Sequence, residues 1–176
     1  MINRSQDSAM DNTLKPQVRL AVQSDEDALM AMVREMHPEA ALKTSGGTPM
    51  PLDEEMARSH LHRAIIPNRN SDELPAWIGL AAESDKILGS IYLSLETLWY
   101  SRQPILVEQW LFVSKENRRS NIAASLIDFA KKSADSAQTT LIVGHMSSGR
   151  EAVKSRFYRR YVGPQIGGYH AHHGAV

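Results

Sequence analysis

The sequence contains no cysteine, and this absence removes several kinds of chemistry at once. Disulfide bonds, thiolate metal sites and a cysteine nucleophile are all excluded. Because disulfides belong to oxidising compartments, a cysteine-free composition also fits the cytoplasmic location that we expect for this chain.

Long apolar runs and a charge imbalance are also lacking. No stretch approaches the roughly 20 apolar residues that a membrane-spanning helix needs. The polar start, Met1–Met10, has no apolar core of the kind found in a signal peptide. Lys and Arg together number 20, as do Asp and Glu, so the net charge is zero and gives no case for nucleic acid or an anionic membrane as partner.

The length of 176 residues fits one domain with one hydrophobic core. Residues 1–16 are polar and show no periodic pattern, so we expect a mobile leader there. Residues 17–176 are expected to form a single domain.

Hydrophobic periodicity and helix-capping signals predict the order β-α-α-β-β-β-α-β-α-β. The expected helices begin near Ser24 (ended by Pro38), at Asp53 (running to about Ile66), near Ile122 and at Glu151 (running to Tyr161). The expected strands are Val18–Val22, Trp77–Ala82, Ile87–Leu95, Ile105–Val113, Leu141–Gly144 and Ile166–His170.

These elements predict an α/β fold with a mixed, mainly antiparallel sheet flanked by helices. The turn-like Ser84–Lys86 joins two strands as a hairpin, which is antiparallel. A helix lies between Ile105–Val113 and Leu141–Gly144, so these two strands are expected to run parallel.

The most informative segment runs from Glu108 to Ala123 and combines a strand, a short charged loop and a helix start. The first backbone N–H groups of a helix lack internal partners and carry partial positive charge, so they form an anion site. Arg118 and Arg119 add charge beside it. The pattern therefore predicts phosphate binding at this loop, against the alternative that both arginines are solvated surface charges.

Here the chain resembles the GNAT superfamily of N-acetyltransferases. The cofactor motif of that family is Q/R-x-x-G-x-G/A after a strand, and Arg118–Ala123 matches its leading arginine, its spacing and its closing small residue. Asn121 replaces the first glycine, which lets the backbone approach phosphate closely. Asn is the non-glycine residue that best tolerates left-handed backbone, so we expect the loop to survive the change.

The resemblance implies acetyl-CoA as co-substrate, with no metal. It implies that the parallel strands Ile105–Val113 and Leu141–Gly144 splay apart at the cofactor site and admit the acyl-CoA arm. It implies that the backbone of Leu111, Phe112 and Val113 pairs with the pantetheine arm. It also implies that the pyrophosphate lies beside Arg118, in a cradle of the backbone amides of Arg119, Ser120, Asn121, Ile122, Ala123 and Ala124.

A second match lies near the end of the chain. Phe157–Gly163 looks like the Tyr-x-x-x-Gly-Phe region of the family, although Pro164 follows Gly163. The resemblance places Tyr158 where the family often has the tyrosine that protonates the departing CoA thiolate. A phenol suits this role because its pKa of about 10 lies near that of a thiol. The glycine-poor loop looks most like acyltransferases of phages and prophages.

Glu108 is a candidate general base, because an amine nucleophile must lose a proton. Strict alternation along the strand places it on the face of Trp110 and Phe112, opposite Leu111 and Val113. It could equally be a substrate-binding or surface carboxylate. A backbone N–H near Leu111–Val113 could stabilise the oxyanion that forms on the thioester.

The histidines give no case for a metal site. His60 and His62 are two apart on a predicted helix and so point to different faces. His170, His172 and His173 lie at the end of the chain, without a carboxylate or cysteine to complete a ligand set.

Three functional hypotheses remain. The first is direct transfer of an acyl group, acetyl in the simplest case, from CoA to an amine, by a chain that acts alone or as a homodimer. The second is a catalytically degenerate member that binds CoA or a protein partner, motivated by Asn121 and Gly163–Pro164. The third is a nucleic-acid or tRNA-directed module, which would use the basic residues Arg150, Lys154, Arg156, Arg159 and Arg160. The sequence leaves the acceptor open among polyamines, amino sugars, peptide N-termini, lysines and charged tRNA.

Overall fold

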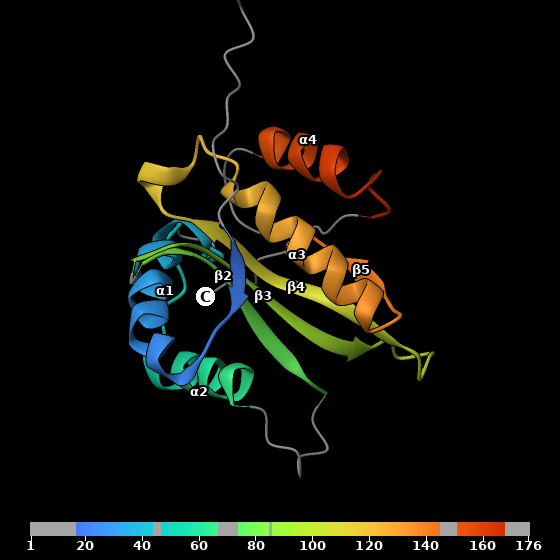
Figure 1. Cartoon of the computed structure of the whole chain (residues 1–176), viewed down its shortest axis with the longest axis horizontal. Helices are drawn as coiled ribbons and strands as arrows, with labels where there is room; N and C mark the ends of the chain where they lie inside the picture. The colour runs from blue at the N-terminus through green and yellow to red at the C-terminus, as the bar shows by residue number, and fades with distance from the viewer. Residues whose placement is uncertain (1–16, 44–46, 67–73, 85, 145–150, 168–176) are drawn as a thin grey trace, which may run out of the picture.

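The structure of the chain is a computed structural model, which describes residues 17–43, 47–66, 74–84, 86–144 and 151–167 (Figure 1). The strands are β1 Val18–Leu20, β2 Ala76–Glu83, β3 Lys86–Thr97, β4 Pro104–Val113 and β5 Thr140–Ile142. The helices are α1 Glu26–Ala40, α2 Glu54–Ile65, α3 Ile122–Ser136 and α4 Glu151–Tyr161. Short 3-10 turns precede α1 and α3, at Gln23–Asp25 and Lys115–Asn117.

The strands form one sheet in the order β1-β2-β3-β4-β5. Neighbours from β1 to β4 are antiparallel, and β4 pairs with β5 in parallel across the α3 crossover. The predicted fold class, a mixed and mainly antiparallel sheet with a parallel pair, is therefore confirmed.

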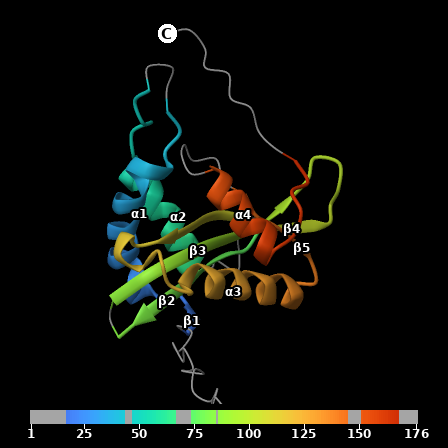
Figure 2. The same ribbon diagram turned by 90° about the horizontal axis from the view of Figure 1, so that it is seen from above.

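Helices cover both faces of the sheet, with α1 and α2 on one face and α3 on the other (Figures 1 and 2). On the α3 face, Leu126 and Ile127 pack with Ile91, Leu93 and Leu106 in one buried cluster. On the opposite face a second buried cluster joins the two N-terminal helices to the sheet through Leu29, Met30, Leu61, Ile78 and Leu80. Each buried side chain of this size contributes about 1.5–3 kcal/mol to folding.

Two glycines allow α3 to lie close to the sheet. A Cβ atom at Gly79 would come within 2.6 Å of the Phe129 ring. A Cβ atom at Gly89 would lie 2.8 Å from the Phe112 carbonyl oxygen and 3.0 Å from Ile122. A side chain at either position would push the helix or the neighbouring strand away.

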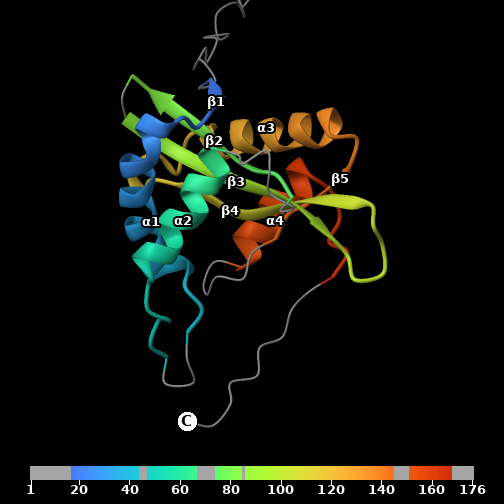
Figure 3. The same cartoon turned by 90° about the horizontal axis from the view of Figure 1, so that it is seen from below.

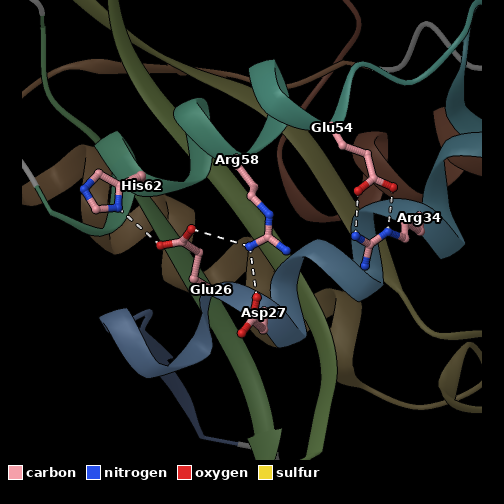
Figure 4. A network of polar contacts seen from close by, with 6 residues as sticks. All are labelled: Glu26, Asp27, Arg34, Glu54, Arg58 and His62. Atoms are coloured by element: carbon pink, nitrogen blue, oxygen red, sulfur yellow. Dashed lines mark hydrogen bonds and ion pairs between the residues drawn. The ribbon is translucent and has the colours of Figure 1, made fainter.

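An exposed polar network links α1 to α2 (Figure 4). Arg34 donates two hydrogen bonds to the Glu54 carboxylate, at 2.7 and 2.8 Å. Arg58 contacts Asp27 at 2.9 Å and Glu26 at 3.7 Å, and His62 reaches the same Glu26 at 3.2 Å. Exposed pairs of this kind contribute at most about 1 kcal/mol each, so the network fixes the orientation of the two helices more than it stabilises the fold.

Two helix boundaries show how local signals compare with the structure. Asp53 caps α2 by accepting the Met56 N–H at 2.9 Å, as predicted. The expectation that Pro38 ends the first helix is wrong, because α1 continues to Ala40. Pro38 lies in the last turn, where its missing N–H removes a single hydrogen bond, and the Ala41 N–H still bonds to the His37 carbonyl at 2.9 Å.

The strand predictions also need corrections. β1 ends at Leu20 and not at Val22, because the Val22 N–H turns to donate to the Asp25 carboxylate at 2.8 Å. β5 ends at Ile142, two residues before the predicted boundary. Ile166 and Gly167 are not in a strand, and the rest of the expected strand, residues 168–170, lies outside the described residues.

None of the described helices is both long enough and apolar enough to cross a bilayer. Residues 1–16 lie outside the described residues, so the division into a leader and one domain stays a prediction.

Candidate functional site

The site is centred on the point where β4 and β5 separate. Their parallel pairing runs only from Ile105↔Thr140 to Val107↔Ile142, whereas β4 continues to Val113 and stays paired with β3 on its other side. In the described part of the chain, no strand therefore covers the β5 side of β4 from Glu108 to Val113. An open strand edge of this kind can bind the backbone-like amides of an extended ligand.

A β-bulge lies at the same point. Tyr92 pairs with Trp110 and Leu93 pairs with Glu108, so Gln109 is an extra residue in β4. A bulge interrupts the alternation of side chains and redirects the residues beside it.

This bulge overturns the predicted orientation of Glu108. Directly paired residues on neighbouring strands point to the same face. Glu108 therefore shares the α3 face with Leu93, and Leu111 shares that face through its pairing with Ile91. The expectation that Glu108 lies opposite Leu111 is wrong, because strict alternation does not allow for the extra residue at Gln109.

The bulge brings Glu108 to Tyr158 of α4. The Tyr158 hydroxyl lies 2.9 Å from Glu108 Oε2 and 3.1 Å from Oε1, and it donates to the carboxylate. Tyr158 and its neighbour Phe157 pack against the buried cluster on the α3 face. The backbone N–H of Gly144, two residues after β5, also bonds to the Glu108 carboxylate, which therefore spans the opening between β4 and β5.

Burial dominates the electrostatics of this pair. It raises the pKa of Glu108 to about 7, against smaller lowering effects of the Tyr158 and Gly144 hydrogen bonds and the Lys154 charge. Burial also raises the pKa of Tyr158 far above its usual value, and the negative charge and hydrogen bond of Glu108 raise it further. Near neutral pH, the pair thus holds a carboxyl group close to half-ionisation and a fully protonated phenol.

The first turn of α3 lies in the predicted phosphate cradle, in which the Ser120 N–H already donates to the Asn117 carbonyl at 3.2 Å. Ile122, Ala123 and Ala124 form its first turn, in which the N–H groups have no carbonyl partner inside the helix. The Ile122 N–H donates to Ser120 Oγ at 3.3 Å. Asn121 has φ −82°, an ordinary value for any residue, so the loop forms at this position without a left-handed backbone.

A pocket of about 360 Å³ lies between the start of α3 and α4. It is lined by Arg118, Ser120, Asn121, Ala123, Ala124, Val153, Arg156, Phe157, Arg160 and Tyr161. Three guanidinium groups and a helix N-terminus meet there, which is an arrangement suited to phosphate. The sequence places Arg156 and Arg160 only in a basic cluster, because their position in this pocket depends on the packing of α4 beside the start of α3.

The two loop arginines differ in position. Arg118 is held by the Glu39 carboxylate of α1 at 2.9 Å and by the Val113 carbonyl at 3.1 Å, with its guanidinium 5.4 Å from the centre of the Phe112 ring. Arg119 is exposed and lies outside the pocket. Arg150 of the predicted basic cluster falls outside the described residues.

Within the described ranges there is no group of three or more His, Cys, Asp or Glu side chains that could hold a metal ion. His60 contacts Arg63 at 2.9 Å, and His62 contacts Glu26. The three C-terminal histidines lie outside these ranges.

No protein-family model and no curated protein matches the chain. Many solved structures match its fold. A protein described as a probable acetyltransferase aligns with 91% of this chain and 97% of its own, at 19% identity and a TM-score of 0.63. The aminoglycoside 6'-N-acetyltransferase AAC(6')-IG of Acinetobacter haemolyticus covers 91% and 99% of the two chains, at 12% identity and a TM-score of 0.62. AAC(6')-Iy, bound to a CoA bisubstrate analogue, covers 91% and 98%, at 10% identity and a TM-score of 0.64. The chain therefore has the fold of the GNAT-type acetyltransferases.

Proposed function

We propose that this chain transfers an acyl group, acetyl in the simplest case, from CoA directly to an amine. The observation that carries the proposal is the Glu108–Tyr158 pair. The pair lies in the opening between β4 and β5, on the same face of the sheet as the pocket between the start of α3 and α4. The fold supports it, because neighbours with this fold are described as N-acetyltransferases and one of them binds a CoA-based analogue.

The donor fits along the open edge of β4. We assign the pantetheine arm to the backbone of Leu111, Phe112 and Val113, which can hydrogen-bond its amides. The pyrophosphate is assigned to the amides of Arg119–Ala124, with Arg118, Arg156 and Arg160 around it. This placement directs the thioester at the end of the arm toward Glu108.

The reaction then needs two proton movements. The amine nitrogen attacks the thioester carbon while Glu108 accepts its proton, for which a pKa of about 7 is well matched. A backbone N–H within Leu111–Val113 stabilises the oxyanion. Collapse of the tetrahedral intermediate breaks the C–S bond, and Tyr158 protonates the thiolate. The proton on Glu108 returns to Tyr158 through their hydrogen bond, so the pair ends as it began.

The hydrogen bond also couples the two steps energetically. While Glu108 is negative, its charge and hydrogen bond raise the pKa of Tyr158, in addition to the effect of burial. Proton uptake from the amine neutralises Glu108 and removes that contribution. Tyr158 therefore becomes a stronger acid at the step in which the thiolate leaves.

Thiol release from acetyl-CoA, measured with and without a panel of amines, tests the proposal. The expected result is amine-dependent release together with an acetylated amine. Binding of acetyl-CoA without turnover would favour the degenerate alternative that Asn121 and Gly163–Pro164 motivate. A mobility shift with tRNA at low salt would favour the nucleic-acid alternative. The phage-type branch, the cytoplasmic location and a homodimeric state remain predictions.

A further inference from the structure

Glu108 lies among apolar side chains on the α3 face of the sheet. Its partner on β3, Leu93, belongs to the buried cluster on this face, together with apolar side chains of α3. Such side chains neither carry charge nor donate hydrogen bonds, so they do not stabilise a carboxylate. In the described part of the chain, the charge and the hydrogen bonds that act on Glu108 come from Lys154 and Tyr158 of α4 and from the Gly144 N–H after β5.

Helix α4 presents one of its faces to this site. Figure 3 shows α4 beside β4, on the side of the sheet away from α1 and α2. Phe157, Tyr158 and Tyr161 pack against the buried cluster on the α3 face. Lys154 precedes these three residues by three, four and seven positions in the same helix. Residues at such spacings share one face of a helix, so Lys154 lies one turn from Tyr158 on the packed face of α4.

The other basic residues of α4 differ from Lys154 in position. Arg156 and Arg160 are exposed and line the pocket beside the start of α3, and Arg159 is exposed and lies outside that pocket. Lys154 is half-buried, and its positive charge lowers the pKa of Glu108, although burial has the larger effect and raises it. Among the described residues, Lys154 is therefore the cation of α4 that acts on the carboxylate bonded to Tyr158.

We propose that Lys154 keeps Glu108 ionised, and so able to accept a proton, near neutral pH. This inference rests on the proposed function, in which Glu108 is the base. A carboxyl group buried among apolar side chains favours its neutral form, which cannot take the proton of the amine. The positive charge of Lys154 opposes that preference. Lys154 acts on the reaction through Glu108, as a positioning residue.

The strength of the base explains why a cation is needed here. A general base works best when its pKa lies near the working pH, because it is then ionised and still strong enough to take the proton. Burial raises the pKa of Glu108, and without Lys154 that pKa would lie above the value of about 7 that the folded protein has. The lysine thus brings the base closer to the match that catalysis at neutral pH requires.

The kinetic test removes the charge of Lys154 and follows kcat/KM across pH. In Lys154→Gln the rising limb should move to higher pH, so the value at pH 6 should fall about threefold or more while the value at pH 9 is retained. Lys154→Met, which keeps most of the side-chain stem, serves the same purpose if Lys154→Gln does not fold. An equal loss at both pH values would overturn the inference and assign Lys154 a packing role.

Two further variants control for the change of charge and shape. Lys154→Arg keeps the positive charge and should restore the wild-type profile. Arg159→Gln removes the same charge from an exposed position of the same helix, outside the pocket, and should leave the profile unchanged. A shift of the limb in Arg159→Gln as large as in Lys154→Gln would overturn a specific action of Lys154.

Titration of the Glu108 carboxyl group separates failure of this inference from failure of the proposed function, because it needs no turnover. NMR of protein carrying isotope-labelled glutamate follows the carboxyl signals, and Glu108→Gln identifies the one that belongs to Glu108. Its midpoint should lie at higher pH in Lys154→Gln than in the wild type, Lys154→Arg or Arg159→Gln. An unchanged midpoint in Lys154→Gln would overturn the inference, whether or not amines are acetylated. A raised midpoint without turnover of any amine would overturn acyl transfer and leave the action of Lys154 on Glu108 in place.

Discussion

The Tyr158 hydroxyl donates to both carboxylate oxygens of Glu108, 50 residues away in the sequence. The contact joins a helix that follows the sheet to a strand within it, at the place where the sheet opens. The predicted base and the predicted acid are therefore in direct contact, and the charge of the carboxylate raises the pKa of the phenol.

Tyr158→Phe should lower kcat by roughly 10²-fold or more, because it removes one acid–base group. The affinity for acetyl-CoA should change little, because phenylalanine keeps the ring that packs against the buried cluster on the α3 face of the sheet. Steady-state kinetics should therefore show a loss in kcat with KM for acetyl-CoA held, the signature of lost transition-state stabilisation.

Tyr100→Phe is the control for that experiment, because Tyr100 is exposed and lies on the β3–β4 loop. It should keep the wild-type rate. Unfolding of Tyr158→Phe would instead mean that Tyr158 has only a packing role. A wild-type rate in Tyr158→Phe would mean that water protonates the thiolate.

The rate should rise with pH through about 7, because Glu108 accepts a proton only as a carboxylate and burial raises its pKa to about 7. The falling limb near pH 10 that an ordinary phenol would give is not expected, since burial and the charge of Glu108 raise the pKa of Tyr158. A profile of kcat/KM between pH 5 and 10 measures both features. In Glu108→Gln the limb at pH 7 should disappear together with most of the activity.

The same pKa predicts how the stability of the fold depends on pH. The folded pKa of Glu108 is above its ordinary value of 4.5, so between about pH 4.5 and 7 the folded state binds more protons than the unfolded state. The contribution of this group to stability is therefore fully present below pH 4.5 and is lost as pH rises through 7. Glu108→Gln removes the loss and should raise the free energy of unfolding by up to about 3 kcal/mol at pH 8.

Denaturant unfolding of both proteins at pH 5 and pH 8 checks this prediction. The two curves should lie close together at pH 5 and separate at pH 8, with the variant more stable. Equal or lower stability of the variant at pH 8 would mean that Glu108 is well solvated or better paired than the geometry indicates.

Periodicity and the helix and turn signals within each segment predict the order of elements from β1 to α4 and the parallel strand pair. The boundaries of α4 are an example, with Val153 and Phe157 one turn apart. The last expected strand is different, because Ile166 and Gly167, its described residues, are not in a strand. The orientation of Glu108 could not be predicted, because the bulge at Gln109 depends on pairing with β3, which no local pattern encodes. For the same reason no local pattern predicts that Glu39 is the partner of Arg118, because Glu39 lies on α1.

Arg118→Glu should weaken acetyl-CoA binding by about 1–3 kcal/mol, because it places a negative charge beside phosphate. Calorimetry measures the change in Kd.

The ion pair with Glu39 makes a second variant informative, since Glu39→Gln frees Arg118 from its partner at 2.9 Å. Tighter or unchanged binding in Glu39→Gln agrees with phosphate contact by Arg118. Unchanged binding in Arg118→Glu would show that this arginine only fastens α1 to the loop.

Asn121→Gly should leave acetyl-CoA affinity within a factor of a few of the wild type. The backbone at Asn121 has φ −82°, which glycine adopts without advantage, and its side chain makes no capping hydrogen bond within the described residues. Stability should fall by only a few tenths of a kcal/mol, as for other Asn→Gly changes at a helix start. A large loss of affinity would assign the Asn121 side chain a contact of its own with the cofactor.

Amine-dependent thiol release from acetyl-CoA, measured for the wild-type protein and for Tyr158→Phe with mass spectrometry of the amine product, tests direct acyl transfer with Tyr158 as the acid. We expect one thiol released for each amine acetylated in the wild type, and a rate roughly 10²-fold lower in Tyr158→Phe. Saturation with acetyl-CoA without release of thiol for any amine would rule out acyl transfer, and equal rates for the two proteins would rule out Tyr158 as the acid.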